Sequence, residues 1–425
     1  MESNEFSTSR VPLENSVHWW RIALINVLFS FSLPALVTGM EMANTTTGAR
    51  LVGSMIAGCV ILTIISILTS VVGSRTRLSS YLLARVAFGA RGSMALNLAF
   101  AVSLVGWFGV NLNLFGTALA RLLPVLSGYH GPLWPVELLA GAVMTFTTLV
   151  GLKAINRLSY VIVPVLVLVC LLLLVRTLGY GSVGDILKLA PTGGLSFGDA
   201  VSSVVGAVIV GAVIMPDTCR FIHPPAGAVW TSILTYFVTN ILVMLIAGLA
   251  ALAVHRNDIL ELMLAMGLGA GAFAIVIGSA WLLNALNLYS ASLSVDAALP
   301  TVSRTTTTLI CGALGTAAAF LQILDHFLSF LFYLSIVFVP VASIIVLDCF
   351  LLRPADYLGG SEPPVRSVEP AALLAWAAGA ALAVLGSAGL VRLTGIAALD
   401  AMLVTGVLHA LLHRRIRGRR APSSS

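Results

Sequence analysis

Apolar residues occur in long blocks along this chain, and short polar stretches separate the blocks. A block of roughly 20 apolar residues is long enough for a helix to cross the hydrocarbon core of a bilayer. We predict about twelve such spans, at residues 20–40, 49–72, 93–120, 133–151, 159–178, 197–220, 227–254, 263–294, 306–324, 327–348, 370–390 and 394–412. The pattern therefore predicts an all-α integral membrane protein.

Composition and charge strengthen this prediction and give the protein an orientation. Only 9% of the residues are charged and the mean hydropathy is +1.02, whereas soluble domains carry about 25% charged residues. The twelve spans place 17 of the 23 basic residues on the side of the amino terminus. Because basic residues favour the cytoplasmic side, we expect both termini in the cytoplasm and the spans in a plasma or bacterial inner membrane.

The predicted spans divide the chain into five regions. A polar tail at residues 1–18 lacks the basic start and short apolar core of a cleavable signal. Residues 19–352 hold ten spans, residues 353–369 form a Pro-rich cytoplasmic linker, and residues 370–412 hold two further spans. The basic tail at residues 413–425 is expected to contact anionic lipid rather than nucleic acid, because it follows a span directly.

An aromatic ring and an amide stand in the middle of the third span. Trp107 and Asn111 are four residues apart and so share one face of a helix, and Gly106 and Gly109 leave open backbone beside the ring. A membrane tryptophan is ordinarily a packing residue or an interfacial anchor. The mid-span position between glycines instead indicates a site where a planar polar ligand stacks and hydrogen-bonds.

Two spans contain residues that interrupt helices. Pro34 and Gly39 fall within the first span, and Gly206 and Gly211 bracket a short apolar piece of the sixth. Proline removes a backbone hydrogen bond and glycine permits unusual dihedral angles. Spans one and six occupy matching places in two repeats of five helices, and transporters bind substrate at such helix breaks. We therefore predict breaks at Pro34, Gly39 and Gly211.

The motifs of membrane enzymes and ATP-driven pumps are missing from the sequence. There is no CxxC pair, no HExxH helix and no Gly-Lys-Ser/Thr phosphate loop, so neither a zinc site nor ATP hydrolysis is expected. The seven histidines lie mainly in loops or near span ends, which argues against catalysis. We expect no enzyme activity, no cofactor and no metal, and we predict no particular oligomeric state.

Five segments of the chain, at residues 81–89, 105–110, 217–221, 284–293 and 339–348, carry a family resemblance. In combination they resemble the purine-cytosine permease type of nucleobase cation symporters, which includes cytosine permeases and, more distantly, hydantoin transporters. The resemblance extends from about residue 20 to residue 353. It implies a LeuT-like fold, with ten core helices in two inverted repeats and two further helices at the carboxyl end.

The resemblance also implies roles for individual side chains. Trp107 corresponds to the aromatic residue that stacks on the heterocycle in this family, and Asn111 matches a position where the hydantoin transporter has an amide that reaches the substrate. Asn284 and Asn287 in the eighth span are two more amides, whose alternative role is hydrogen bonding between helices. An amide suits a nucleobase because it carries both a donor and an acceptor. We expect at least one of this pair to contact substrate.

Two departures from the family pattern change the expected site. Beside Gly206, the family's serine and aromatic residue correspond to Ala207 and Val208, so an aromatic sandwich becomes one aromatic and one aliphatic wall. Backbone groups of these three residues remain available to substrate. The hydroxyl residues of the usual sodium site correspond to Leu282 and Leu283, and leucine offers no oxygen to a cation. A sodium site of the usual kind is therefore not expected.

If a cation is coupled to transport, a proton is the expected one, because titratable groups inside a membrane carry protons. Glu41 follows the span-one break and is the first candidate carrier; its alternative role is a solvated residue at the outer end of that span. Asp217 is the second candidate, although its spacing from Arg220 also fits a structural ion pair.

These observations together predict a secondary active importer of a nucleobase or a related small planar heterocycle, working by alternating access. The alternative cargo is a thiamine-precursor pyrimidine, allantoin or a hydantoin, which the aliphatic Val208 favours. The alternative class is a membrane receptor that binds the same ligands without transporting them.

Overall fold

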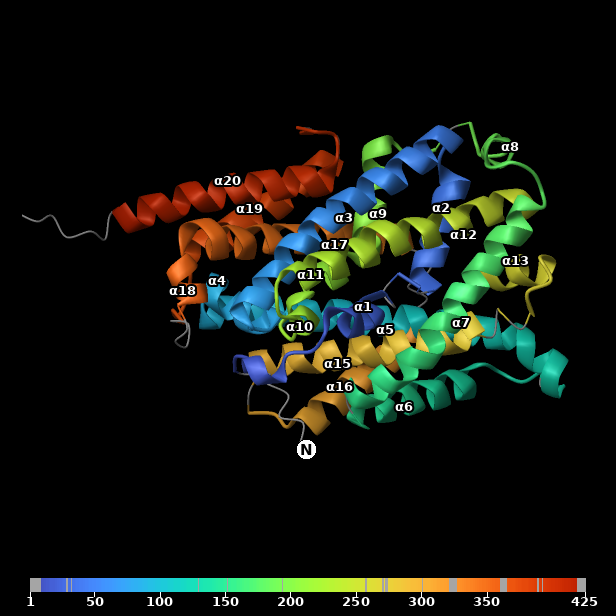
Figure 1. Ribbon diagram of the computed structural model, residues 1–425, viewed down its shortest axis with the longest axis horizontal. Coiled ribbons are helices and arrows are strands. Elements are labelled where there is room, and N and C mark those ends of the chain that lie inside the picture. Colours follow the sequence, from blue (N-terminus) through green and yellow to red (C-terminus); the bar gives the residue numbers. More distant parts are fainter. Residues whose placement is uncertain are drawn as a thin grey trace, which may run out of the picture.

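The computed structural model describes residues 9–418 except residues 28–29, 32, 129, 151, 193, 257, 270, 272–273, 300, 321–326, 360–364, 388–389 and 392. The elements of the first half, up to the sixth predicted span, are helical (Figure 1). They are η1 (Leu13–Asn15), α1 (Trp19–Val27), α2 (Leu33–Thr45), α3 (Gly48–Thr76), α4 (Ser80–Phe88), α5 (Ala90–Ser127), α6 (Trp134–Val150), α7 (Leu152–Leu178), α8 (Val183–Leu187), α9 (Phe197–Val213) and α10 (Pro216–Cys219).

The second half continues in the same way, with π-helical turns at η2, η3 and η5. Its elements are α11 (Ala226–Ser232), η2 (Ile233–Thr239), α12 (Asn240–Val254), α13 (Ile259–Ala265), η3 (Ala274–Ser279), α15 (Ala280–Ala298), α16 (Arg304–Ala319), α17 (Phe327–Leu347), η5 (Asp348–Leu352), α18 (Pro354–Leu358), α19 (Pro370–Ser387) and α20 (Ala397–Gly418). The first part of the predicted basic tail at residues 413–425 is thus helical.

Every predicted span coincides with one or more of these helices. Among the described residues, six helical stretches are long and apolar enough to cross a membrane, and they lie at Gly48–Thr76, Ala90–Ala120, Arg157–Leu178, Phe197–Cys219, Ala226–Val254 and Ser329–Leu352. Two shorter apolar helices lie at Trp134–Val150 and Pro370–Gly386. The prediction of an all-α membrane protein is confirmed.

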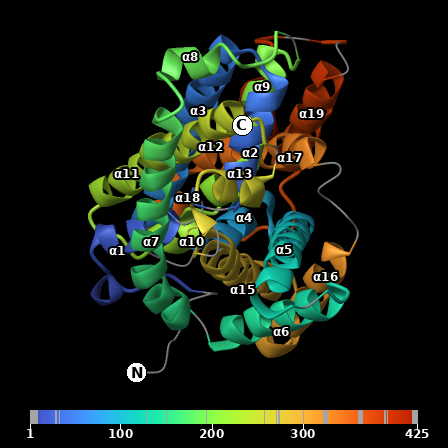
Figure 2. The same ribbon diagram turned by 90° about the vertical axis from the view of Figure 1, so that its right-hand side faces the viewer.

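The helices form two groups that face each other. In one group α2 packs on α12 and α3 packs on α9, while in the other α5 packs on both α15 and α16, and α6 packs on α16. The groups occupy the upper and lower halves of the molecule in Figure 1 and remain separate in Figure 2. Helices α19 and α20 pack against each other and against α17, outside both groups.

The first predicted span is broken between α1 and α2. Helix α1 ends at Val27 and α2 begins at Leu33. Pro34 is the second residue of α2, where its missing N–H removes no hydrogen bond because the first turn of a helix has no intrahelical acceptor. The Ser30 hydroxyl in the break donates to the Thr235 carbonyl of η2 at 2.8 Å. Pro34 therefore fits at the start of the helix that follows the break, whereas it would not fit in a helix interior.

The sixth span is broken between α9 and α10, at Ile214 and Met215. The predicted break at Gly211 is wrong, because α9 continues through Gly211 to Val213. The predicted break at Gly39 is wrong for the same reason, since α2 runs on to Thr45. The break in span one therefore lies just before Pro34, and the break in span six lies between Gly211 and Pro216.

The glycines serve close helix packing instead. A Cβ atom on Gly39 would overlap the carbonyl oxygen of Met244 in α12, and one on Gly206 would overlap the carbonyl oxygen of Leu331 in α17. Glycine removes the side chain that would otherwise hold two helices apart, as in small-residue contacts between membrane helices. Gly39 and Gly206 thus let the neighbouring helices approach at backbone distance.

A buried cluster of charged and polar residues joins η5, the predicted linker and α20. Asp348 accepts hydrogen bonds from Arg353, from His409 Nε2 at 2.8 Å and from the Tyr357 hydroxyl at 3.3 Å. Arg353 also lies 3.5 Å from a Glu369 carboxylate oxygen. The side chains of Asp348, Arg353 and His409 are at most 1% exposed. His409 stands three residues before the end of the predicted span at residues 394–412, and it lies within α20 because this helix runs on to Gly418.

Backbone contacts fix the same region to α4. The Glu369 N–H donates to the Phe88 carbonyl at 3.0 Å, at the end of α4. The next residue, Gly89, has φ = +82°, and a Cβ on it would lie 2.8 Å from Val368 Cα. A non-glycine residue would be strained in this left-handed conformation as well as crowded. The described part of the predicted 353–369 linker is therefore packed against the core.

Candidate functional site

One small cavity collects side chains from four helices, which correspond to predicted spans one, three, six and eight. It lies beside the span-one break. Its lining residues are Pro34 of α2, Leu104 and Trp107 of α5, Ala207, Val208, Val210 and Gly211 of α9, and Leu283 and Asn287 of α15. The two helix groups of the fold meet here, because α2 and α9 belong to one and α5 and α15 to the other.

The indole ring of Trp107 forms one wall of the cavity and is 6% exposed. Its centroid lies 5.3 Å from that of Phe330 in α17, and the two rings are inclined by 69°. An edge-to-face pair of this kind holds the indole in one orientation. Ala207 and Val208 of α9 belong to the same cavity. Phe330 was not singled out from the sequence, where it is one of several phenylalanines in an apolar block.

The three predicted amides separate in the structure. Asn287 lines the cavity. Asn284 is fully buried, and its Nδ2 donates to the Phe108 carbonyl of α5 at 3.1 Å. Asn111 is also fully buried, and its Nδ2 donates to the Trp107 carbonyl one turn earlier at 2.9 Å. Only Asn287 of these three contributes to the cavity lining, so the structure brings together Trp107 and Asn287.

Some of the remaining residues predicted for the site line the cavity, and others are packed in the protein interior. Gly206 packs against the Leu331 backbone rather than lining the cavity, whereas Gly211 is part of the lining. Of the two leucines at the expected sodium positions, Leu283 lines the cavity and Leu282 is fully buried. Both present hydrocarbon, which cannot coordinate a hard cation.

The two predicted titratable residues lie in different surroundings. Glu41 is half-buried on α2, beyond the cavity residue Pro34 along the same helix. Asp217 is buried on α10, and its Oδ1 accepts a hydrogen bond from the Ser80 N–H at 2.7 Å. Arg220 Nε donates to the Asp217 carbonyl oxygen at 3.2 Å. The Asp217 carboxylate therefore stabilises the amino-terminal end of α4, where backbone N–H groups lack helical partners.

The cavity is small in this conformation. Its volume is about 30 Å³, above the roughly 10–15 Å³ that one water molecule needs. Pockets for drug-sized ligands begin at roughly 300 Å³. A heterocycle can enter only if the surrounding helices separate, and the breaks beside α2 and α10 are the places where the two spans can bend independently.

Breaks in spans one and six, with a cavity beside them, are the arrangement in which α-helical membrane transporters bind substrate. The sequence model of permeases for cytosine/purines, uracil, thiamine and allantoin matches residues 14–407. The chain belongs to this family. The family membership expected from the resemblance is thereby confirmed.

Individual relatives and solved structures agree with this assignment. The chain is 27% identical to the cytosine permease of Escherichia coli (strain K12) over 383 residues, which cover 89% of each protein. It is 25% identical to the hydantoin permease of Microbacterium maritypicum over 211 residues, or 49% of this chain and 43% of that protein.

The fold is similar to that of Mhp1, a nucleobase-cation-symport-1 family transporter, in a closed conformation with bromovinylhydantoin bound. The TM-score is 0.83 at 19% identity, and the match covers 99% of this chain and 97% of that one. A Na⁺-coupled sialic acid symporter in an outward-open state gives a TM-score of 0.67 at 11% identity, over 94% of this chain and 90% of that one. The LeuT-like transporter fold is confirmed.

Proposed function

We propose that this protein imports a nucleobase, cytosine or a purine, or a related small planar heterocycle by alternating access. The observation that carries the proposal is the convergence of Trp107, Val208 and Asn287 on one cavity beside a helix break. The identity shared with cytosine permease along most of both chains supports the same class of substrate.

The chemistry of the cavity suits a flat, polar ring. The indole of Trp107 would stack on one face of the heterocycle, while Val208 and Ala207 would cover the other face with aliphatic carbon. The Asn287 amide would hydrogen-bond the ring edge, as its donor and acceptor match the alternating donors and acceptors of a nucleobase. Backbone groups near Gly206 are a further proposed contact once the helices separate.

The direct test is a panel of purines, pyrimidines, hydantoins and vitamin precursors added to detergent-purified protein. We expect one class to raise the thermal unfolding temperature, because a ligand that binds only the folded state stabilises it. The same compound, radiolabelled, should accumulate in proteoliposomes. Stabilisation without uptake would favour the receptor, and a flat response across the panel would contradict the heterocycle assignment.

A thiamine-precursor pyrimidine, allantoin or a hydantoin is the second candidate cargo. The observation that favours it is the aliphatic wall at Val208, which replaces one face of an aromatic sandwich. A ligand that needs only one stacking surface tolerates this change better than one held between two rings. The same panel separates the two candidates by which compounds stabilise the protein most.

We predict that Asn287→Ala weakens substrate binding about tenfold, because one hydrogen bond to a buried ligand is lost. Asn284→Ala is the matched control on the same helix, since its amide hydrogen-bonds the Phe108 carbonyl instead. This control should lower thermal stability but leave the dissociation constant within about twofold, because the Asn284 amide does not line the cavity. Equal losses of affinity in the two variants, measured by ligand titration, would contradict the assignment.

We propose a proton as the coupling ion, with Glu41 as its carrier and Asp217 as the second candidate. The hydrocarbon of Leu282 and Leu283 at the expected sodium positions supports this proposal. Uptake should be unchanged when external sodium is replaced by potassium. An inward proton gradient, with the outside acidic, should increase uptake. Glu41→Gln should remove the response to the gradient, whereas Asp217→Asn should mainly lower stability. If uptake strictly requires sodium, the proton cannot be the sole coupling ion.

We further propose that both termini lie in the cytoplasm and that the spans lie in a plasma or bacterial inner membrane. The excess of basic residues on the side of the amino terminus supports this orientation. In this arrangement residues 353–369 are a cytoplasmic segment between a ten-helix core at residues 19–352 and two further helices at residues 370–412. The basic residues after His413 would then meet the anionic inner leaflet.

A further inference from the structure

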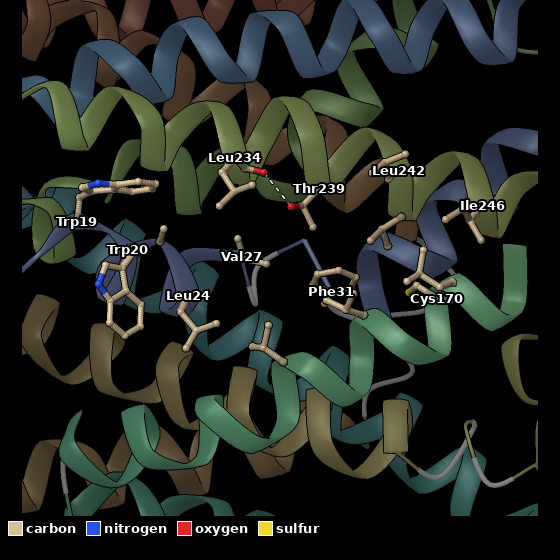
Figure 3. A pocket seen from close by; sticks show the side chains of 15 residues that line it. Trp19, Trp20, Leu24, Val27, Phe31, Cys170, Leu234, Thr239, Leu242 and Ile246 are labelled. Carbon is tan, nitrogen blue, oxygen red and sulfur yellow. Dashed lines mark hydrogen bonds between the residues drawn. The ribbon is translucent and has the colours of Figure 1, made fainter.

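A long apolar groove runs between α1, α7 and the continuous η2–α12 helix, away from the substrate cavity (Figure 3). Its volume is about 380 Å³. The wall contains one threonine, Thr239, whose hydroxyl donates to the Leu234 carbonyl at 2.8 Å and is therefore already satisfied. Leu171 on the α7 side is 53% exposed, so the groove opens to the outside of the helix bundle at this residue. Walls of this kind bind hydrocarbon.

One end of the groove has a different character. Trp20 of α1 and Tyr160 of α7 meet there, with ring centroids 6.3 Å apart, and both are more than 40% exposed. The Arg21 guanidinium carbon lies 5.6 Å from the Trp20 ring centroid. Arg157 is exposed and precedes Tyr160 by three residues on α7, so the two share a helix face. This end joins two aromatic rings to two cations.

The two parts of the groove match the two parts of a lipid. Tryptophan and tyrosine collect at the headgroup level of membranes, and arginine there attracts anionic headgroups. We propose that the groove binds one anionic phospholipid, with an acyl chain between α1, α7 and α12 and the phosphate against Arg21 and Arg157. Charge complementarity at the aromatic end selects an anionic lipid over a zwitterionic one.

The position of the groove gives the lipid a consequence for transport. Val27, the last residue of α1, and Phe31, in the break after it, line the groove, while Pro34, at the start of α2, lines the substrate cavity. A lipid in the groove therefore contacts the half-helix that leads directly to the cavity. We expect this lipid to hold α1 against α7 and so to change the rate of transport. This expectation rests on the proposed transport function.

Lipid retention tests the proposal without requiring transport. Protein is reconstituted with equal amounts of phosphatidylglycerol and phosphatidylcholine and then partly delipidated. Native mass spectrometry identifies the lipids that remain bound by their mass. Leu171→Trp fills the groove, and Leu172→Trp is the matched control, because Leu172 is the next residue on α7, is 42% exposed and lies outside the groove. We expect wild type and Leu172→Trp to keep one phosphatidylglycerol, and Leu171→Trp to lose at least four-fifths of it.

The headgroup contact has its own variant. Arg21→Gln combined with Arg157→Gln should remove the preference for phosphatidylglycerol, whereas Arg91→Gln, an exposed arginine at the start of α5, should not. Equal retention of the two lipids by wild type, or equal retention by the Leu171 and Leu172 variants, would overturn the proposal. Because retention is measured without a heterocycle, its outcome is independent of the substrate panel, which tests the proposed function separately.

Discussion

Replacing Trp107 by alanine is expected to lower substrate affinity roughly 5- to 150-fold and to abolish measurable uptake at low substrate concentration. The estimate follows from base stacking on an aromatic side chain, which contributes about 1–3 kcal/mol. The indole is the aromatic side chain among the residues that line the cavity, and Ala207 and Val208 of α9 contribute aliphatic carbon to the same lining. No second ring of the α9 wall can therefore replace the lost stacking surface. Trp107→Phe should recover part of the affinity.

The control for this prediction is the neighbouring residue on the same helix. Phe108 is fully buried and packs against Gly315 of α16 rather than lining the cavity. Either substitution by alanine removes a large buried ring, which costs about 3–5 kcal/mol of stability in a protein core. Phe108→Ala should therefore lower the thermal unfolding temperature like Trp107→Ala but retain near-normal affinity in the folded fraction. If both variants bind substrate equally well, Trp107 is a packing residue.

Replacing Asp348 by alanine is expected to destabilise the protein by about 3–5 kcal/mol, the usual cost of breaking a buried ion pair. Asp348 accepts hydrogen bonds from Arg353, His409 and Tyr357 in a site that is nearly closed to solvent. Without it the Arg353 cation keeps the more distant Glu369 carboxylate, at 3.5 Å, and the Ala87 carbonyl, at 3.4 Å. The measurement is the midpoint of thermal unfolding in detergent, together with the yield of folded protein.

An exposed ion pair supplies the comparison. Asp185 of α8 and Lys188, the residue directly after this helix, lie 2.8 Å from each other and have side chains that are 62% and 78% exposed. Solvent screens such a pair, so its net contribution is small. Asp185→Ala should leave the unfolding midpoint unchanged. Similar shifts for the two aspartate variants would contradict an energetic role for the buried cluster.

The sequence predicts the spans well because a membrane imposes one strong pattern, an apolar block of fixed length. It also predicts the break beside Pro34, because proline is accommodated in the first turn of a helix but not in a helix interior. The glycines are different: the same absence of a side chain permits either a bend or close packing. Only the position of the Met244 carbonyl shows that Gly39 packs, and that position depends on a helix some 200 residues away.

In the candidate site, too, the sequence predicts what depends on neighbouring residues but not what depends on contacts between distant helices. A ring and an amide at mid-span mark Trp107 and Asn111 from the sequence alone, but the rotation of each helix decides which of them meets a cavity. Asn284 and Asn287 are three residues apart, and their amides have different neighbours because α15 turns Asn284 toward α5. Phe330 was missed because an aromatic residue in an apolar block carries no signal of its own.

The buried charge cluster also orders the assembly of the protein. Asp348 and Arg353 belong to the end of the tenth span and the start of the segment after it, whereas His409 belongs to α20. A ribosome therefore delivers the carboxylate and the guanidinium to the membrane well before their histidine partner has been synthesised. The cluster can close only after α20 has been synthesised and inserted, so it makes the stability of the transporter depend on the insertion of that helix.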